Sequence, residues 1–395
     1  MIEISGLRKY KVAGGRGVRL EADIKFVDVD ADYPASTLYF EIRKRYGAMF
    51  SDDTYDAFFL VGLYLAMYHK TPLRIRGNVS KKLYKNANWY IQKILCDFSE
   101  ELSPVDVIVE GFAPTEIKGV LIGTGISCGV DSLSTVYDRF VRETDPDYKI
   151  NTLFIFNCGS HGDYGAEHTP IVFESRIKRA MAVSEELSLP LIIVDSNLHC
   201  FRHKSDKSTL LFLSFYACVL SLQNAIRRYY MPSGCSYQGI KNCGGKEYHN
   251  DLATACDSYL VPLIQSDRTE LIVDGCQRRR VDKIADLADW EIARKYLNVC
   301  LVQKGADTTN CGICSKCLRT LLTLEILGKL DDFAQVFNVE EYRENSFPYK
   351  ARCIKNADYG IFYKEIIDLA AEKNFPMPIE KTCYVLEGNV IIPDD

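Results

Sequence analysis

The stretch GTGISCGVDSLSTV, Gly123 to Val136, contains the residue types of this chain that are best suited to phosphate chemistry. It lies between an apolar run and a helical pattern, so its small residues are expected to form a tight turn whose backbone N–H groups bind an anion. Ser127 and Ser132 can donate hydroxyl groups to phosphate oxygens, and Gly129 lets the backbone approach closely. An acidic Asp131 beside phosphates requires a cation. The stretch therefore predicts a nucleotide-binding loop with Mg²⁺ at Asp131.

Other phosphate loops fit this stretch less well. A Walker A loop is excluded because the Gly-Lys-Ser/Thr ending is absent. A Rossmann loop is excluded because Gly123, Gly125 and Gly129 have the wrong spacing. A plain strand–loop–helix turn with an Asp-Ser cap is the simpler alternative. The apolar strand before the loop and the helix after it favour nucleotide binding.

A second group of residues has the spacing of a metal site. Cys311, Cys314 and Cys317 form a Cys-x-x-Cys-x-x-Cys run, and Cys300 lies shortly before it. Three thiolates at this spacing can wrap one metal ion from a tight turn, with Gly312 easing the bend, and a fourth completes a tetrahedral site. Such a closed site is typical of structural Zn²⁺. An iron–sulfur cluster with four cysteine ligands is the alternative.

The elements that must position these residues alternate between strand and helix from about residue 116 onward. This alternation predicts an α/β fold with a doubly wound, mainly parallel sheet, in which ligands bind at the carboxyl ends of the strands. Residues 1–115 are predicted to form an N-terminal α+β accessory domain. Residues 116–335 are predicted to form a nucleotide-binding domain with the cysteine site, and 336–395 a C-terminal extension without a chemical signal.

The loop resembles that of the PP-loop ATP pyrophosphatases, which are adenylating enzymes with an adenine nucleotide α-hydrolase-like fold. Their pattern is Ser-Gly-Gly-x-Asp-Ser, and this chain has Ser127-Cys128-Gly129-Val130-Asp131-Ser132, with Cys128 in place of a glycine. The loop together with the four cysteines resembles 7-cyano-7-deazaguanine synthase and its relatives over residues 117 to 330. In that enzyme the four cysteines hold zinc. The N- and C-terminal segments of this chain have no counterpart there.

The resemblance implies a set of site residues. Ser127, Asp131 and Ser132 are implied to be catalytic. The implied nucleotide-binding residues are Gly125, Ser127, Cys128, Gly129, Val130, Asp131, Ser132, Phe156 and Asn157.

Further candidates come from charge and from position. His161 follows the second strand of the predicted sheet, and Arg279 and Lys283 lie at the start of a predicted helix, where they could hold phosphates or a substrate carboxylate. A solvated charged face is the alternative for these cations. Lys316 and Arg319 flank the cysteine cluster and could reach the same crevice.

The activity implied by the resemblance is adenylation of a small, deazapurine-like carboxylate by ATP, which gives AMP and pyrophosphate. Ammonia or an amine then displaces AMP to form an amide or nitrile. Attachment of such an acid to a protein amine is an alternative. RNA thiolation is a second alternative and would need a sulfur-carrying cysteine such as Cys128 or Cys158. A non-catalytic nucleotide-binding module is a third alternative.

Composition narrows the expected partners and location. The net charge of −5 argues against a nucleic-acid ligand held mainly by its phosphates, although a local basic patch is compatible with it. No run of residues has the apolar length that a bilayer requires. The N-terminus lacks a signal-peptide pattern, so a cytoplasmic location is expected and the 15 cysteines are not expected to form a disulfide framework. A homo-oligomer is a further expectation.

Overall fold

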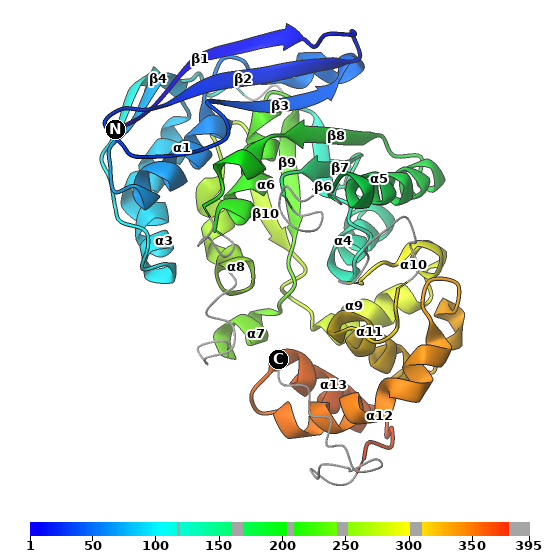
Figure 1. Ribbon diagram of the computed structural model, residues 1–395. Helices are drawn as coiled ribbons and strands as arrows, with labels where there is room; N and C mark the ends of the chain where they lie inside the picture. The colour runs from blue at the N-terminus through cyan, green and yellow to red at the C-terminus, as the bar shows by residue number, and fades with distance from the viewer. Residues whose placement is uncertain (117–118, 160–168, 204–208, 243–251, 301–309, 379–395) are drawn as a thin grey trace.

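The computed structural model describes residues 1–116, 119–159, 169–203, 209–242, 252–300 and 310–378. Its strands form one ten-stranded sheet in the order β10-β9-β6-β7-β8-β3-β2-β1-β4-β5 (Figure 1). The strands are β1 (Ile2–Lys11), β2 (Gly17–Phe26), β3 (Thr37–Arg43), β4 (Leu73–Val79), β5 (Val107–Phe112), β6 (Leu121–Gly125), β7 (Thr152–Asn157), β8 (Leu191–Ser196), β9 (Ile226–Pro232) and β10 (Glu270–Asp274).

Helices connect these strands and extend the chain beyond them. The α-helices are α1 (Asp56–Tyr68), α2 (Lys81–Asn86), α3 (Gln92–Phe98), α4 (Val130–Val136), α5 (Thr169–Glu186), α6 (Thr209–Ser221), α7 (Tyr237–Asn242), α8 (Leu252–Ile264), α9 (Arg280–Ala288), α10 (Glu291–Tyr296), α11 (Ser315–Ile326), α12 (Val339–Asn356) and α13 (Ile361–Glu372). Two π-helical turns, η2 (Ala87–Ile91) and η3 (Tyr137–Arg142), continue α2 and α4, and three 3₁₀ turns are η1 (Lys44–Met49), η4 (Leu198–Phe201) and η5 (Asp331–Phe333).

The part of the sheet from β6 to β10 has the predicted doubly wound arrangement. Strand β6 pairs in parallel with β7 on one side and with β9 on the other, and β8 and β10 extend the two sides in parallel. The chain therefore reverses its direction of winding between β6 and β9. The predicted α/β class with a mainly parallel sheet is confirmed. In such sheets the crevice at the reversal point, outside the carboxyl ends of the strands, is the usual ligand site.

The N-terminal strands continue the same sheet. Strand β3 pairs antiparallel with β8, and Phe40 and Glu41 lie opposite Ser196 and Asp195. One hydrophobic core runs from β1 through the mostly buried helices α1 and α6 to β10. The boundary at residues 115 and 116 stays a prediction, because both the sheet and this core are continuous across it.

A second hydrophobic core lies beneath the predicted nucleotide loop. It joins α4, α9 and α11 to the C-terminal helices α12 and α13. The C-terminal helices therefore pack directly on the elements that carry the candidate site, as Figure 1 shows for α11, α12 and α13. Among the described helices, none combines the length and the apolar composition that a bilayer-spanning helix needs.

Candidate active site and metal centre

The predicted nucleotide loop follows β6, and the hydroxyl groups of its two serines form hydrogen bonds within the loop. The backbone N–H of Gly129 donates to Ser127 Oγ at 3.3 Å, and Ser127 Oγ lies 3.1 Å from Ser132 Oγ. Ser132 Oγ also donates to the carbonyl of Gly129 at 3.2 Å. Both hydroxyl groups therefore lie at the start of α4, beside the backbone turn that would receive phosphate oxygens.

Cys128, which replaces the glycine of the family pattern, adopts a left-handed backbone conformation with φ of 59°. A residue with a side chain pays about 1–2 kcal/mol for this conformation. Two contacts help to hold it. The Cys128 side chain is 1% exposed within the second core, and its carbonyl accepts the backbone N–H of Asn298 at 2.7 Å. The loop thus has at this position a backbone conformation that glycine adopts most readily, despite the substitution.

Asp131 lies in the first turn of α4 and is paired with two buried cations from α9. Its Oδ2 accepts from Arg280 Nη1 at 2.7 Å, and its Oδ1 lies 3.5 Å from Lys283 Nζ. The side chains of Arg280 and Lys283 are 8% and 1% exposed, and that of Asp131 is 24% exposed. Burial alone would raise the pKa of Asp131, but the charges of Arg280 and then Lys283 outweigh it and lower that pKa.

The Oδ1 atom of Asp131 is buried and accepts no hydrogen bond from the described part of the chain. A buried carboxylate oxygen without a hydrogen bond is uncommon in folded proteins. One carboxylate together with substrate phosphates is the ligand set that Mg²⁺ usually takes. Asp131 therefore has the chemistry that could hold the predicted magnesium ion, although its Oδ1 also faces the ammonium group of Lys283 at 3.5 Å.

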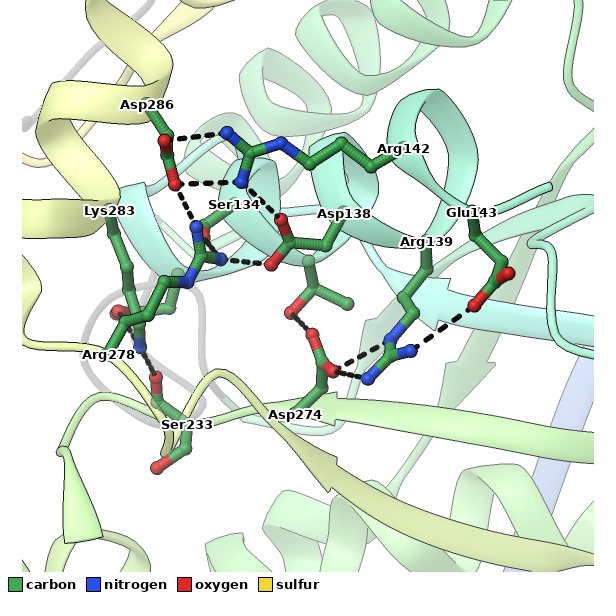
Figure 2. Close-up of polar contacts among 12 residues, drawn as sticks. Ser134, Asp138, Arg139, Arg142, Glu143, Ser233, Asp274, Arg278, Lys283 and Asp286 are labelled. Carbon is green, nitrogen blue, oxygen red and sulfur yellow. Dashed lines mark hydrogen bonds and ion pairs between the residues drawn. The ribbon is translucent and has the colours of Figure 1, made fainter.

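An ion-pair network fixes α9 against α4 and η3. Arg278 contacts the carboxylates of Asp138 and Asp286, and its Nη2 donates to Ser134 Oγ at 2.8 Å. Figure 2 shows this guanidinium between the two carboxylates, with a separate pair formed by Arg139 and Asp274 at the end of β10. The network holds the start of α9 beside the loop, and so determines where the cations of α9 lie.

Lys283 reaches the loop past a glycine at the end of β10. Its Nζ donates to the carbonyl of Ser233, which follows β9, at 2.7 Å (Figure 2). A Cβ atom at Gly275 would lie 2.9 Å from this Nζ, and Gly275 has a φ of 93°. A glycine is thus required here both for its conformation and for the close approach of the ammonium group. Lys283 and the loop meet at the reversal point between β6 and β9.

The C-terminal helix α13 completes the surroundings of the cations. Glu365 is 3% exposed, and its Oε2 accepts the backbone N–H of Arg280 at 2.8 Å. Burial raises the pKa of this carboxyl group, although hydrogen bonding and the charge of Arg280 oppose the shift. The ring of Phe362 lies 3.9 Å from Arg319 Cζ and 5.8 Å from Arg280 Cζ, which are distances typical of cation–π contacts.

The charge around the loop is positive in balance. Lys316, at the start of α11, has its pKa lowered by desolvation and by repulsion from Arg280 and Arg319, so these groups lie close together. With Lys283 they make four cations, against the two carboxylates of Asp131 and Glu365. A cluster of partly buried cations of this kind is suited to a polyanion such as a triphosphate.

The carboxyl ends of β7 and β8 carry a separate polar group. Asn157 Nδ2 donates to Asp195 Oδ1 at 2.7 Å, and Ser196 Oγ donates to the carbonyl of Asn157 at 2.8 Å. Burial raises the pKa of Asp195. These residues lie at the same edge of the sheet as the loop.

Other predicted residues have different surroundings. Val130 and Phe156 are 0% and 4% exposed, so only their backbone atoms could contact a ligand. Arg279 is bound by Asp282 on its own helix and by Glu372 on α13, and within the described part of the chain no hydrogen bond or ion pair joins it to the loop. His161 lies outside the described residues.

The four predicted cysteine ligands come together. The Sγ atoms of Cys300, Cys311, Cys314 and Cys317 all lie within 4.8 Å of one another, close enough to bind one metal ion such as zinc. The backbone N–H of Cys314 points to Cys311 Sγ at 3.3 Å. Gly312 has a φ of 83° between these two cysteines, which is the bend expected for it.

Asn310 supports the cysteine cluster from within. Its side chain is buried, and Oδ1 accepts the backbone N–H groups of Val299 and Cys300 at 2.8 and 3.0 Å. Its Nδ2 donates to the carbonyls of Leu297 and Val336. This one amide therefore joins the segment that carries the first cysteine to the segment that carries the other three.

These features define the class of the protein as an α/β protein with a mainly parallel sheet and a four-cysteine cluster that could hold a metal such as zinc. Comparison with protein-family models, curated proteins and solved structures finds no match to this chain. The functional assignment therefore depends on the geometry of the site.

Sequence reasoning missed some of the residues that the site depends on. It chose Arg279 among three consecutive arginines, whereas Arg280 is the one that contacts Asp131. Helical periodicity contained a usable signal, because Lys283 is three residues after Arg280 and lies on the same face. The roles of Glu365 and Asn310 had no local signal, since their partners are distant in the sequence.

Proposed function

We propose that this protein is an ATP-dependent, AMP-forming ligase that adenylates a small carboxylate, resembling a deazapurine acid, and joins it to ammonia or an amine. The observation that supports this most is the pairing of Asp131 with Arg280 and Lys283 in a loop that follows the first strand of the doubly wound part of the sheet. A carboxylate and two cations at a reversal point suit Mg²⁺ and a polyphosphate together.

In the proposed first step, a carboxylate oxygen of the acid attacks the α-phosphorus of ATP. The bond from that phosphorus to the oxygen bridging to the β-phosphorus breaks, and pyrophosphate leaves. Arg280, Lys283 and the loop N–H groups offset the negative charge that develops on the leaving group. Mg²⁺ at Asp131 would supply further charge neutralisation at the phosphates.

In the second step, the nitrogen of ammonia or an amine attacks the acyl carbon of the adenylate. The acyl carbon–oxygen bond to AMP breaks, AMP leaves, and the nitrogen loses a proton. A nitrile would require a second ATP, which adenylates the amide oxygen before AMP and a proton are lost. Asp195 has a raised pKa at the same edge of the sheet and is the candidate acceptor of the amine proton.

The cysteine cluster has a structural role in this proposal. The four cysteines would hold zinc. The first of them is also close to a contact with the loop, because Asn298, whose backbone N–H donates to the carbonyl of Cys128, is two residues before Cys300. A metal that fixes Cys300 thereby supports the left-handed conformation of the loop.

A protein amine is the second candidate nucleophile. The N-terminal strands extend the sheet well beyond the nucleotide-binding part, which provides surface for a macromolecular acceptor. RNA thiolation is less well supported, because burial raises the pKa of Cys128 to about 12 and leaves its side chain 1% exposed. A thiol in that state is a poor sulfur carrier.

The test is to incubate the full-length protein with Mg²⁺, ATP labelled at the α-phosphate and candidate acids, beginning with 7-carboxy-7-deazaguanine and ammonium. Labelled AMP that depends on the acid is the expected product. Asp131→Asn should abolish the formation of labelled AMP. Asp282→Asn alters the ion pair with Arg279, which does not contact the loop, and should retain AMP formation. Release of ADP, or no turnover with any acid, would reject the adenylating ligase and, in the second case, favour a non-catalytic nucleotide-binding module.

A further inference from the structure

The continuous helix formed by α2, η2 and α3 has one face in the core and one face in solvent. Its buried side chains, each 0% exposed, are spaced four residues apart: Leu83, Ala87, Ile91 and Leu95. Offset from them by two residues, and so on the opposite face, is an exposed row with the same spacing: Lys81, Lys85, Trp89 and Lys93. Lys82 and Tyr90 flank this row and are exposed as well.

Within the described part of the chain, no aromatic, cation–π or side-chain hydrogen-bond contact involves the rings of Trp89 and Tyr90. Trp89 is 72% exposed and Tyr90 is 53% exposed. Both lie in η2, the π-helical turn, and π-helical turns inside helices occur frequently at functional sites. The neighbouring Phe112 of β5 is 44% exposed, and Lys81 Nζ lies 5.9 Å from its ring centroid. Exposed aromatic rings and lysines thus share this surface.

The charge of the row is opposite to that of the whole protein. The helical segment 81–98 carries four lysines and one aspartate, whereas the chain has a net charge of −5. Lys93 pairs with Asp97, and within the described residues no ion pair involves Lys81, Lys82 or Lys85. Uncompensated cations on an otherwise acidic protein attract an anionic partner.

We propose that this lysine–aromatic row, defined as Lys81, Lys82, Lys85, Trp89, Tyr90 and Lys93, binds single-stranded nucleic acid, with RNA as the occupant. Cations that follow the phosphates, together with exposed rings on which bases stack, are the combination that single-stranded nucleic acids require. Protein interfaces are depleted in lysine, which makes an acidic protein a poorer fit. The proposal concerns binding alone and does not depend on the adenylation chemistry.

A membrane surface fits the row less well. Helices that lie on membranes bury a continuous apolar face in the lipid. Here that face is already occupied, because Leu83, Ala87 and Ile91 lie in the protein core, and Asn86 fixes the helix to α8 through a 2.8 Å hydrogen bond to the carbonyl of Leu263. Only the two rings of Trp89 and Tyr90 would remain to enter a bilayer.

The binding test uses the full-length protein and a fluorescein-labelled polyuridylate of about fifteen nucleotides, followed by anisotropy. Trp89→Ala should weaken binding about ten-fold, which is the loss expected for one stacked base. Replacing Lys81 and Lys85 by Gln should reduce the slope of log affinity against log salt by about 1.4, because each phosphate contact on a single strand contributes about 0.7. Lys93→Gln should also weaken binding, and Lys178→Gln is its matched control, since both lysine side chains are 72% exposed and each pairs with a carboxylate four residues away.

A second readout reports stacking directly. The chain has two tryptophans, and Trp290 packs against Tyr137 at 5.3 Å between ring centroids. Polyuridylate should therefore quench the fluorescence of Trp89, and Trp89→Phe should remove that quenching. Unchanged melting temperatures would show that the variants fold.

Three outcomes would overturn the proposal. The first is that polyuridylate does not bind, and the second is that Trp89→Ala and Lys178→Gln weaken it equally. The third is that vesicles rich in phosphatidylserine, or a polyglutamate peptide, bind through the row while polyuridylate does not.

Discussion

Removal of the Asp131 carboxylate is expected to destabilise the protein as well as to stop AMP formation. In Asp131→Ala, the buried cations Arg280 and Lys283 lose the carboxylate that compensates them. Removal of one partner from a fully buried pair costs about 3–5 kcal/mol. Because Asp131 is 24% exposed, we expect a smaller loss of about 2–3 kcal/mol in the free energy of unfolding.

This loss can be expressed as a melting temperature. An unfolding entropy of about 2.1 cal/mol/K per residue gives about 0.8 kcal/mol/K for 395 residues, so the melting temperature should fall by about 3 °C. The pKa of Asp131 is lowered from 3.8, so its carboxylate stabilises the folded protein above that pH. The difference between the variant and the wild type should shrink as the pH falls below this value.

A ligand test separates this explanation from a general loss of packing. With two uncompensated cations, Asp131→Ala should be stabilised by pyrophosphate in the absence of Mg²⁺, and by more than the wild type is. The control is Asp282→Ala, which removes a partly exposed partner of Arg279 and should cost no more than about 1 kcal/mol. If Asp131→Ala melts like the wild type and gains nothing from pyrophosphate, the charge pairing described for this site is wrong.

Three further predictions concern the surroundings of the loop. Purified protein should contain about one zinc per chain by elemental analysis, and Cys314→Ser should remove it and lower the melting temperature; iron with sulfide would contradict this. Gly275→Ala should displace Lys283 Nζ and cost about 1–3 kcal/mol in stability, measured by denaturant unfolding, because the new Cβ would lie 2.9 Å from that atom. Glu365→Ala should weaken ATP binding, measured by calorimetry, because the start of α9 loses its acceptor, whereas Glu365→Gln should keep most of the affinity; equal losses in both would contradict the role of the hydrogen bond to Arg280.

Much of the fold could be predicted from local patterns in the sequence. The alternation of strand and helix after residue 116 was sufficient to predict the α/β class and a mainly parallel sheet, because the apolar runs are short and are followed by helical periods. The join between β3 and β8 could not be predicted this way. It depends on the pairing of Phe40 with Ser196, which lie far apart in the chain, and strand pairing of this kind leaves no periodic signal.

The site was predictable where one motif carries the geometry. The cysteine cluster assembles as its spacing predicts, because three of its four ligands lie close together in the sequence, at the bend that leads into α11. The contacts of the cations were harder to predict. The side chains of three consecutive arginines point in different directions, and only the packing of the fold determines which of them reaches the loop. Arg278 forms an ion pair with Asp138, Arg279 with Glu372, and Arg280 with Asp131. The left-handed conformation of Cys128 was likewise beyond the sequence, because its support comes from Asn298.

The join between β3 and β8 has a mechanical consequence. A hinge between the N-terminal strands and the nucleotide-binding part would have to break the hydrogen bonds that cross the join beside Phe40 and Ser196 and open a core that runs through both parts. The strands of the described sheet are therefore expected to move together as one rigid body. Any movement that admits a substrate to the loop should come instead from α9 and α13, where the contacts of Glu365 and Glu372 and the packing of the second core join helices and no strand pairing is crossed. Such contacts can separate and re-form without breaking a strand.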